Sequence, residues 1–131
     1  MKSYDPIPQY LEVLAKETVD AVYQVHTTLG PGLLESVYER CLAYELSTRS
    51  IRVEAQVPFP VFYKDIKLDA GLRIDLLIED QLIVEVKSVE IMHPVFEAQL
   101  LTYLKLTGRR LGFLINFNVP LIKDGIKRMV L

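Results

Sequence analysis

Two apolar, β-prone runs lie on either side of a short turn in the stretch GLRIDLLIEDQLIVEVKSVE, residues 71–90. Such runs predict two buried strands of a hairpin. Three ionisable side chains, Asp75, Glu85 and Lys87, interrupt them. An ionised group is costly to bury unless it is paired, neutralised or bound to a metal. The fold must therefore supply this hairpin with a counter-charge, a proton or a cation.

The predicted turn decides whether the three groups meet. A turn centred on Asp80 sets Asp75 opposite Glu85 and Arg73 opposite Lys87. Because side chains alternate along a strand, Glu85 and Lys87 share a face, and Asp75 joins them in this register. Directly opposed side chains lie roughly 5 Å apart at Cβ, and like charges there are destabilising. A slip of one residue would separate the two carboxylates.

Three arrangements would stabilise such a pair of carboxylates. A divalent cation can bridge the oxygens, or Lys87 and Arg73 can neutralise them in a salt-bridge network, and the sequence favours these two equally. The third, in which one carboxyl keeps its proton, is less favoured. All three remain open at this stage.

The chemistry of the donors indicates which cation would suit the hairpin. The chain has one cysteine, Cys41, and two histidines, so no Cys/His cluster indicates structural zinc. Two carboxylates suit Mg²⁺ or Mn²⁺, which keep several waters and accept a phosphate oxygen. A lysine beside such an ion can orient a metal-bound water or stabilise charge on phosphate oxygens. Asp75 followed by Glu85-x-Lys87 is thus the set that metal-assisted phosphodiester hydrolysis requires.

The remaining chain predicts an α/β or α+β fold with helices packed on a sheet. Spacings of three and four predict helices, and β-rich runs bounded by turns predict strands, in the order ααβββαβ(β). The expected helices are residues 9–29, 33–49 and 94–107, and the expected strands 51–63, 66–78, 82–89 and 110–117. The tail GIKRMV is either a fifth strand or a helical turn. Pro58 and Pro60 predict an edge strand or a bend, and Gly71 predicts a bulge.

Length and composition favour one domain spanning residues 1–131. Half of the 131 residues are hydrophobic, which is enough for a core without disulfides. No apolar run has membrane-spanning length, and the N-terminus lacks a signal-peptide pattern. We therefore expect a cytoplasmic protein that does not bind membranes.

The net charge of −2 is not that of a typical nucleic-acid binder. The segment after Ala98 nevertheless holds six basic residues against one acidic residue, Asp124. The basic residues are Lys105, Arg109, Arg110, Lys123, Lys127 and Arg128. They either form a patch for a polyanion or are solvated residues at helix ends and turns, and the second interpretation is the simpler one.

At the charged hairpin the chain resembles the PD-(D/E)XK nuclease superfamily. Asp75 matches the first acidic position, and Glu85-Val86-Lys87 matches the (D/E)XK triplet. Ile74 stands where the name-giving proline would be, at a position that varies in the superfamily. The resemblance implies a restriction-endonuclease-like core with a mixed sheet flanked by helices, and it implies Mg²⁺ or Mn²⁺ as cofactor.

A second set of motifs resembles the GxxExxY protein family, within the RecB-like branch. The segments are GPGLLESVYE, which holds GLLESVY at 32–38, RIDLLI, EAQLLTYLKLTG and LINFNVPLIKDGIKR. They cover nearly the whole chain. The resemblance implies a nuclease-like site without specifying a substrate.

The resemblance also implies roles for individual residues. Asp75, Glu85 and the backbone carbonyl of Val86 would hold the metal, and Lys87 would be the catalytic amine. Glu35 matches a helical glutamate that often adds a carboxylate, although its place beside the apolar helix face fits a solvated residue equally well. The residues implied near the substrate are Gln99 and Tyr103, which look like a Q-xxx-Y motif, with Arg73, Lys105 and Lys127 as further candidates. Gln99 and Tyr103 could equally be a surface pair beside a core stripe.

Two classes of function fit these observations. The first is a metal-dependent nuclease acting on DNA, with RNA as the second candidate. The alternative is a catalytically silent module of the same fold that binds nucleic acid or assembles with proteins. A homodimer and a complex with a partner subunit both remain open.

Overall fold

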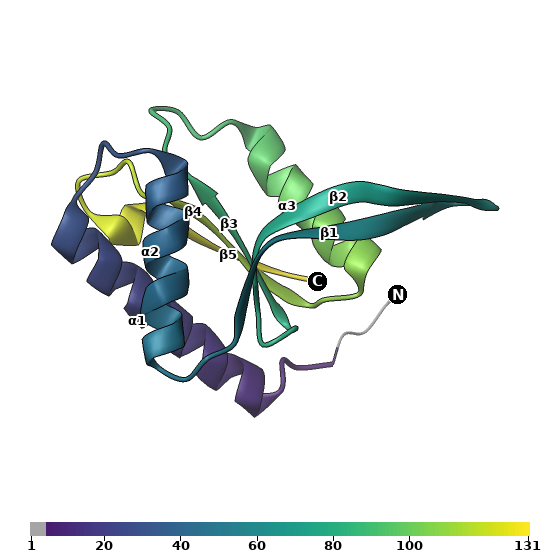
Figure 1. Cartoon of the computed structure of the whole chain (residues 1–131), viewed down its shortest axis with the longest axis horizontal. Coiled ribbons are helices and arrows are strands. Elements are labelled where there is room, and N and C mark those ends of the chain that lie inside the picture. Colours follow the sequence, from purple (N-terminus) through teal and green to yellow (C-terminus); the bar gives the residue numbers. More distant parts are fainter. Residues whose placement is uncertain (1–4) are drawn as a thin grey trace.

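A five-stranded mixed sheet with helices on both faces forms the body of the computed structural model, which describes residues 5–131 (Figure 1). This arrangement confirms the predicted fold class. The elements in chain order are α1 (Gln9–Leu29), α2 (Glu35–Thr48), β1 (Val53–Tyr63), β2 (Ile66–Ile78), β3 (Leu82–Lys87), α3 (Pro94–Thr107), β4 (Leu111–Asn116), the 3₁₀ helix η1 (Ile122–Gly125) and β5 (Ile126–Val130).

The strands follow the order β1-β2-β3-β4-β5 across the sheet. β3 and β4 are parallel and joined through α3, whereas all other neighbours are antiparallel. The parallel pair is buried almost completely, as its continuous apolar sequence predicts. α1 and α2 cover one core on one face of the sheet, and α3 covers a second core on the other. β1 is an edge strand, which accommodates its prolines.

Some predicted boundaries were wrong near the site. The second helix begins at Glu35 instead of residue 33, so Leu33 and Leu34 precede it with exposed side chains. The third strand ends at Lys87 because the next backbone N–H groups leave the ladder. Ser88 N donates to Glu35 Oε2 and Val89 N donates to Asn116 Oδ1. In the tail GIKRMV, residues 125–130, Ile126–Val130 form the strand β5, and the 3₁₀ helix η1 precedes it.

The register of the β2–β3 hairpin confirms the turn prediction. Ile78 pairs with Leu82 and Leu76 pairs with Val84, so the next position would set Asp75 opposite Glu85. The regular ladder stops at Leu76–Val84. The two acidic residues therefore lie where the two strands begin to separate.

β2 also changes faces at Asp75. Leu76 and Ile78 pack in the core beneath α1 and α2, whereas Leu72 and Ile74 pack in the core beneath α3. Regular alternation would place all four on one face. The regular pairing of β1 with β2 is interrupted at the same level, where Gln56 has a left-handed φ of 54°. The β1–β2 hairpin is thus twisted at this level, so that the side chains of β2 change faces as the hairpin leaves the sheet.

Beyond this point the hairpin projects from the body as an arm, which we define as residues 61–69 (Figure 1). Lys64 and Asp65 form its turn, as predicted. The predicted irregularity at Gly71 is confirmed by a register shift between Phe59 and Val61 on the opposite strand. A Cβ at Gly71 would lie 2.3 Å from Val61 Cγ2, so glycine is required for the strands to pass each other.

No helix within residues 5–131 has both the length and the apolar character needed to cross a membrane.

Candidate active site

A polar pocket of about 530 Å³ opens between β2, β3 and α3 at the base of the arm. Its walls contain six residues that the sequence analysis selected: Arg73, Asp75, Glu85, Lys87, Gln99 and Tyr103. Pro58, Ala70, Gly71 and Leu72 complete the lining. The fold therefore brings the predicted carboxylates, the predicted amine and the Q-xxx-Y pair to one cavity.

Asp75 and Glu85 take over the hydrogen bonds that the β ladder would otherwise make. Asp75 N donates to Glu85 Oε2 at 2.9 Å, and Val86 N donates to Asp75 Oδ2 at 2.9 Å. Each carboxylate thus binds the backbone of the opposite strand through one oxygen. The second oxygen of each, Asp75 Oδ1 and Glu85 Oε1, takes no part in this exchange. The strand separation is therefore satisfied internally while both carboxylates stay beside the pocket.

Burial makes this carboxylate pair hard to ionise. Glu85 is only 3% exposed, and its burial, followed by repulsion from Asp75, raises the pKa of Glu85 to about 8. Burial also raises the pKa of Asp75, against the hydrogen bond from Val86 N and the charge of Lys87. None of the ion pairs in residues 5–131 involves Asp75 or Glu85. Of the three arrangements left open by the sequence, the salt-bridge network is therefore absent here, and the protein alone favours a retained proton.

Lys87 is held by an aromatic ring instead of by a carboxylate. Its Nζ lies 4.5 Å from the centroid of the Phe96 ring on α3. A cation over a ring face is attracted by the ring quadrupole. The ammonium group therefore has a partner that leaves both carboxylates available to another ligand.

α3 supplies the far wall of the pocket. His93 caps the helix by accepting a hydrogen bond from Val95 N, Pro94 occupies the first turn, and Gly108 ends the helix in the left-handed conformation. Gln99 and Tyr103 then lie one turn apart on the same helical face. Burial raises the pKa of the Tyr103 phenol, and the nearby Glu85 and Asp75 raise it further.

Other candidates lie outside this pocket. The Glu35 carboxylate accepts a hydrogen bond from Ser88 N at 3.2 Å, so it ties α2 to the loop after β3. Its charge still reaches Asp75 and raises the pKa of that carboxyl slightly. Lys127 lies 3.8 Å from Glu97, and Lys105 is exposed on α3. Neither lysine is in the pocket lining.

The basic patch predicted after Ala98 is partly committed to internal pairs. Arg109 binds Asp80 at 2.7 Å, and Arg128 makes a bidentate pair with Glu12 at 2.8 and 2.9 Å. Arg110 donates to the backbone carbonyl of Leu131. Three of the six basic residues are therefore engaged by groups of the protein itself.

Sequence reasoning missed two residues beside Asp75. Gln56 Nε2 donates to both carboxylate oxygens of Glu39, at 2.7 and 2.9 Å. Burial raises the pKa of Glu39, the Gln56 bond opposes this, and Asp75 raises it again, so the acidic groups are electrostatic neighbours. Glu39 had a sequence signal, since it follows Glu35 by one helical turn. Gln56 had none, because its left-handed backbone is not visible in a strand pattern.

The oxygens at the pocket match the donors preferred by a hard divalent cation. A cation would also relieve the repulsion that raises the pKa of Glu85. Within residues 5–131 no group of three or more His, Cys, Asp or Glu side chains gathers in a way that could hold a metal. An ion bound by Asp75 and Glu85 would therefore complete its shell with waters, backbone oxygen and substrate, as Mg²⁺ readily does.

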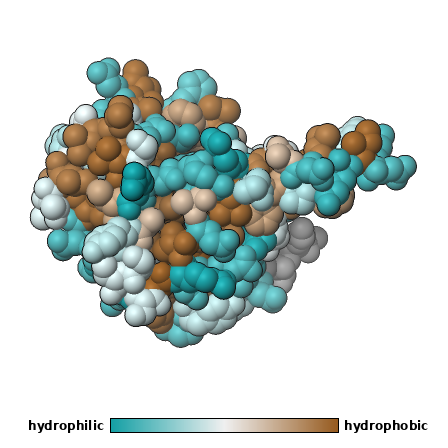
Figure 2. All heavy atoms as spheres, viewed as in Figure 1, coloured by the Kyte–Doolittle hydropathy of each residue, from teal (hydrophilic) through white to brown (hydrophobic). Residues whose placement is uncertain are grey.

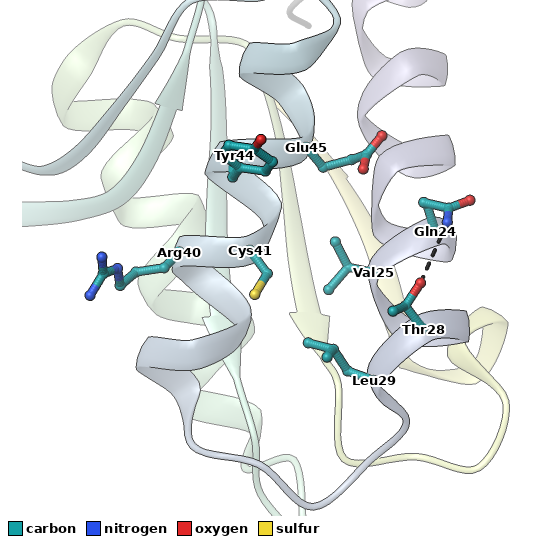
Figure 3. Close-up of a pocket in the computed structure, with 8 residues that line it drawn as sticks. All are labelled: Gln24, Val25, Thr28, Leu29, Arg40, Cys41, Tyr44 and Glu45. Carbon is teal, nitrogen blue, oxygen red and sulfur yellow. Dashed lines mark hydrogen bonds between the residues drawn. The ribbon is translucent and has the colours of Figure 1, made fainter.

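A second pocket, of about 410 Å³, lies between α1 and α2 (Figure 3). Val25, Leu29, Cys41 and Tyr44 contribute to its wall, and Gln24 donates to Thr28 at its rim. The two pockets share no lining residue. Its position on the helical layer separates it from the carboxylate pair.

Comparison with known families agrees with the fold. The family model PDDEXK_3, described as PD-(D/E)XK nuclease superfamily, matches residues 12–129. The chain therefore belongs to the PD-(D/E)XK nuclease superfamily, whose nucleases generally use divalent metal ions. No curated protein and no solved structure matches the chain.

Proposed function

We propose that the protein is a divalent-metal-dependent nuclease that hydrolyses phosphodiester bonds in nucleic acid, with DNA favoured over RNA. The observation that carries this proposal is the hydrogen-bond exchange between β2 and β3. It holds the Asp75 and Glu85 carboxylates side by side, with one oxygen of each outside the exchange. Superfamily membership supports the same chemistry.

In this proposal Asp75, Glu85 and the Val86 carbonyl hold Mg²⁺ or Mn²⁺. When bound, the ion supplies an activated water and polarises the phosphate. Lys87, held over Phe96, positions the attacking water and stabilises developing negative charge. Arg73, Gln99 and Tyr103 contact the nucleotides beside the scissile bond. Glu35 stands as a further candidate ligand or as the residue that positions the loop after Lys87.

Within the superfamily we assign the chain to the GxxExxY family and its RecB-like branch. GLLESVY at 32–38 and the pair Gln99 and Tyr103 support this assignment. We propose that the protein is a single cytoplasmic domain. It acts alone, as a homodimer or with a partner subunit.

A catalytically silent binding module of the same fold is the alternative. Two observations favour it: the described residues gather no three-carboxylate cluster, and Arg109 and Arg128 are engaged in ion pairs. Against it, the pocket retains both carboxylates and the amine.

A cleavage assay separates the two functions. Circular single-stranded DNA, duplex DNA and RNA would be incubated with Mg²⁺ or Mn²⁺, and EDTA would serve as the blank. We expect the parent protein to cleave at least one substrate, Lys87→Ala to be inactive, and Lys105→Ala, which alters an exposed lysine outside the pocket, to remain active. A parent protein that binds nucleic acid but cleaves none of these substrates would support the silent module.

A further inference from the structure

The arm carries an unusual concentration of exposed apolar side chains. Phe62 is 64% exposed, Tyr63 63%, Ile66 59% and Leu68 52%. A hairpin that served only as structure would gain nothing from leaving these groups in water. The arm is therefore a candidate interaction surface.

Both faces of the arm have this character. Tyr63 pairs with Ile66 and Val61 pairs with Leu68 on one face, whereas Phe62 pairs with Lys67 on the other. The arm extends away from the helices, and Figure 2 shows hydrophobic and hydrophilic side chains mixed along it. A ligand can thus approach rings and charges together.

Cations accompany both aromatic rings. Lys64 Nζ lies 5.4 Å from the Tyr63 ring centroid, and Lys67 Nζ lies 6.0 Å from that of Phe62. A second copy of the chain seated on the arm would have to bury these lysines together with Asp65 and Asp69, which is costly. A nucleic acid would instead use rings and lysines at once, since bases stack on aromatic groups and phosphates attract cations.

The arm is continuous with the carboxylate pocket. Pro58, Ala70 and Gly71, at the base of the arm, line that pocket. The Gly71 backbone lies directly against Val61, where the arm begins. A strand that leaves the pocket on this side would pass along the arm.

We propose that the arm is a stacking platform for unpaired nucleotides of the substrate strand. Phe62 on one face and Tyr63 on the other are the stacking rings. Lys64 and Lys67 contact phosphates, and Lys67 exchanges its partner Asp69, which lies 3.7 Å away, for a phosphate. This inference rests on the proposed nuclease function for its position in the reaction, and it specifies the substrate as single-stranded nucleic acid or a frayed end. Paired bases are already stacked on each other, so a blunt duplex gains little from the two rings.

Binding measurements test the platform directly. The double variant Phe62→Ala/Tyr63→Ala would be compared with Tyr44→Ala, which removes an equally exposed tyrosine from α2. In fluorescence anisotropy with labelled single-stranded DNA and Mg²⁺, in the Lys87→Met background to prevent turnover, we expect the double variant to lose about tenfold or more in affinity. Tyr44→Ala and binding to a blunt duplex should change little.

Conservative variants show whether stacking is the cause. Phe62→Tyr/Tyr63→Phe keeps two rings and should retain the parent affinity. Phe62→Leu/Tyr63→Leu keeps apolar surface without rings and should lose affinity like the alanine variant. If the leucine variant binds as tightly as the parent, the arm is only a hydrophobic contact and the stacking proposal is overturned.

A small diester separates this inference from the nuclease proposal. Bis(p-nitrophenyl) phosphate can enter the pocket without reaching the arm, so the arm variants should hydrolyse it at the parent rate while losing activity on single-stranded DNA. A parent protein that hydrolyses no diester would contradict the nuclease function. The anisotropy measurements would still test whether the arm binds single-stranded DNA. Equal binding by parent and double variant would overturn the arm proposal. So would a parent dimer that the double variant converts to monomer in analytical ultracentrifugation, because it would assign the arm to a second copy.

Discussion

The two halves of β2 belong to one continuous strand and have opposite environments. Residues 74–78 are buried except for the half-buried Asp75, whereas residues 66–71 are exposed throughout. The inner half packs between two cores, and the outer half forms the arm with β1. Asp75 lies at the junction, where the strand changes faces and leaves β3. The proposed site therefore lies where the packing of the sheet stops. Along this one strand, a segment buried in the cores is followed by the proposed site and then by the proposed substrate-binding arm.

The largest effect is expected at the junction, for Lys87→Met. Loss of a group that acts in the transition state typically costs about 10²–10³-fold in rate. Lys87 has no ion pair with Asp75 or Glu85, so we expect the fold to persist and the affinity for metal to be retained or raised. Cleavage rates and thermal melts with EDTA and with Mg²⁺ measure both. A variant that unfolds and is not rescued by Mg²⁺ would indicate a structural role.

The contrast between the two halves should appear directly in stability. Leu76→Ala empties a fully buried position and is expected to cost about 2–5 kcal/mol. Leu68→Ala, on the arm, should stay within about 0.5 kcal/mol of the parent. Urea denaturation of both variants provides the measurement. Comparable losses would mean that the arm is packed in solution against another surface.

Gln56→Gly tests the position on β1 at which the regular pairing with β2 is interrupted. Glycine adopts the left-handed φ of Gln56 without strain, so stability should be unchanged or rise by up to about 1 kcal/mol. The variant also removes the amide that hydrogen-bonds Glu39 and that partly offsets the rise in the pKa of Asp75 caused by burial. Loss of such supporting contacts typically costs about 10–100-fold in metal affinity or activity. An active, more stable variant would show that Gln56 has no positioning role.

The carboxylate pair predicts a dependence on pH and metal. The folded-state pKa of Glu85 is about 8, above its unfolded value, so its contribution to stability is complete below the unfolded pKa and is lost as pH rises toward 8. In the proposed site Mg²⁺ would bind the ionised pair, so it should raise the melting temperature more at pH 8 than at pH 5. Asp75→Asn should erase this response, whereas Asp69→Asn on the arm should keep it. An identical response to Mg²⁺ in Asp75→Asn and the parent would count against the metal site.

The smallest effect concerns the lysines. Removing one phosphate contact to a single strand should reduce the slope of log K against log salt by about 0.7. We expect this reduction for Lys64→Ala and Lys67→Ala on the arm. The sequence-based candidates Lys105 and Lys127 should produce a smaller change, since they lie on α3 and β5 and not on the arm. If Lys105 and Lys127 reduced the salt slope more than Lys64 and Lys67, the substrate would bind along the body of the protein instead of the arm.

The sequence was sufficient for the elements and for the central pair. Periodicity placed α1, β2 and α3 at their observed bounds, and the turn at Asp80 predicted the register that sets Asp75 opposite Glu85. These features depend on neighbours in the chain, because side-chain alternation and turn chemistry are local. The motif residues that suggested the superfamily, Asp75 and Glu85-Val86-Lys87, lie on β2 and β3, and the family match confirms that membership.

Only the tertiary structure decided how the pair is satisfied and what surrounds it. The left-handed Gln56 beside Glu39 and the engagement of Arg109 and Arg128 each bring together residues from different elements of the fold. Each backbone or charged group there has several hydrogen-bond or ion-pair partners within reach. Which partner it binds depends on which segments the fold brings together. A strand pattern records only that residues 66–78 favour extended structure. Whether such a strand is buried or projects into solvent is decided by the number of layers packed against it, and for β2 that number changes at Asp75.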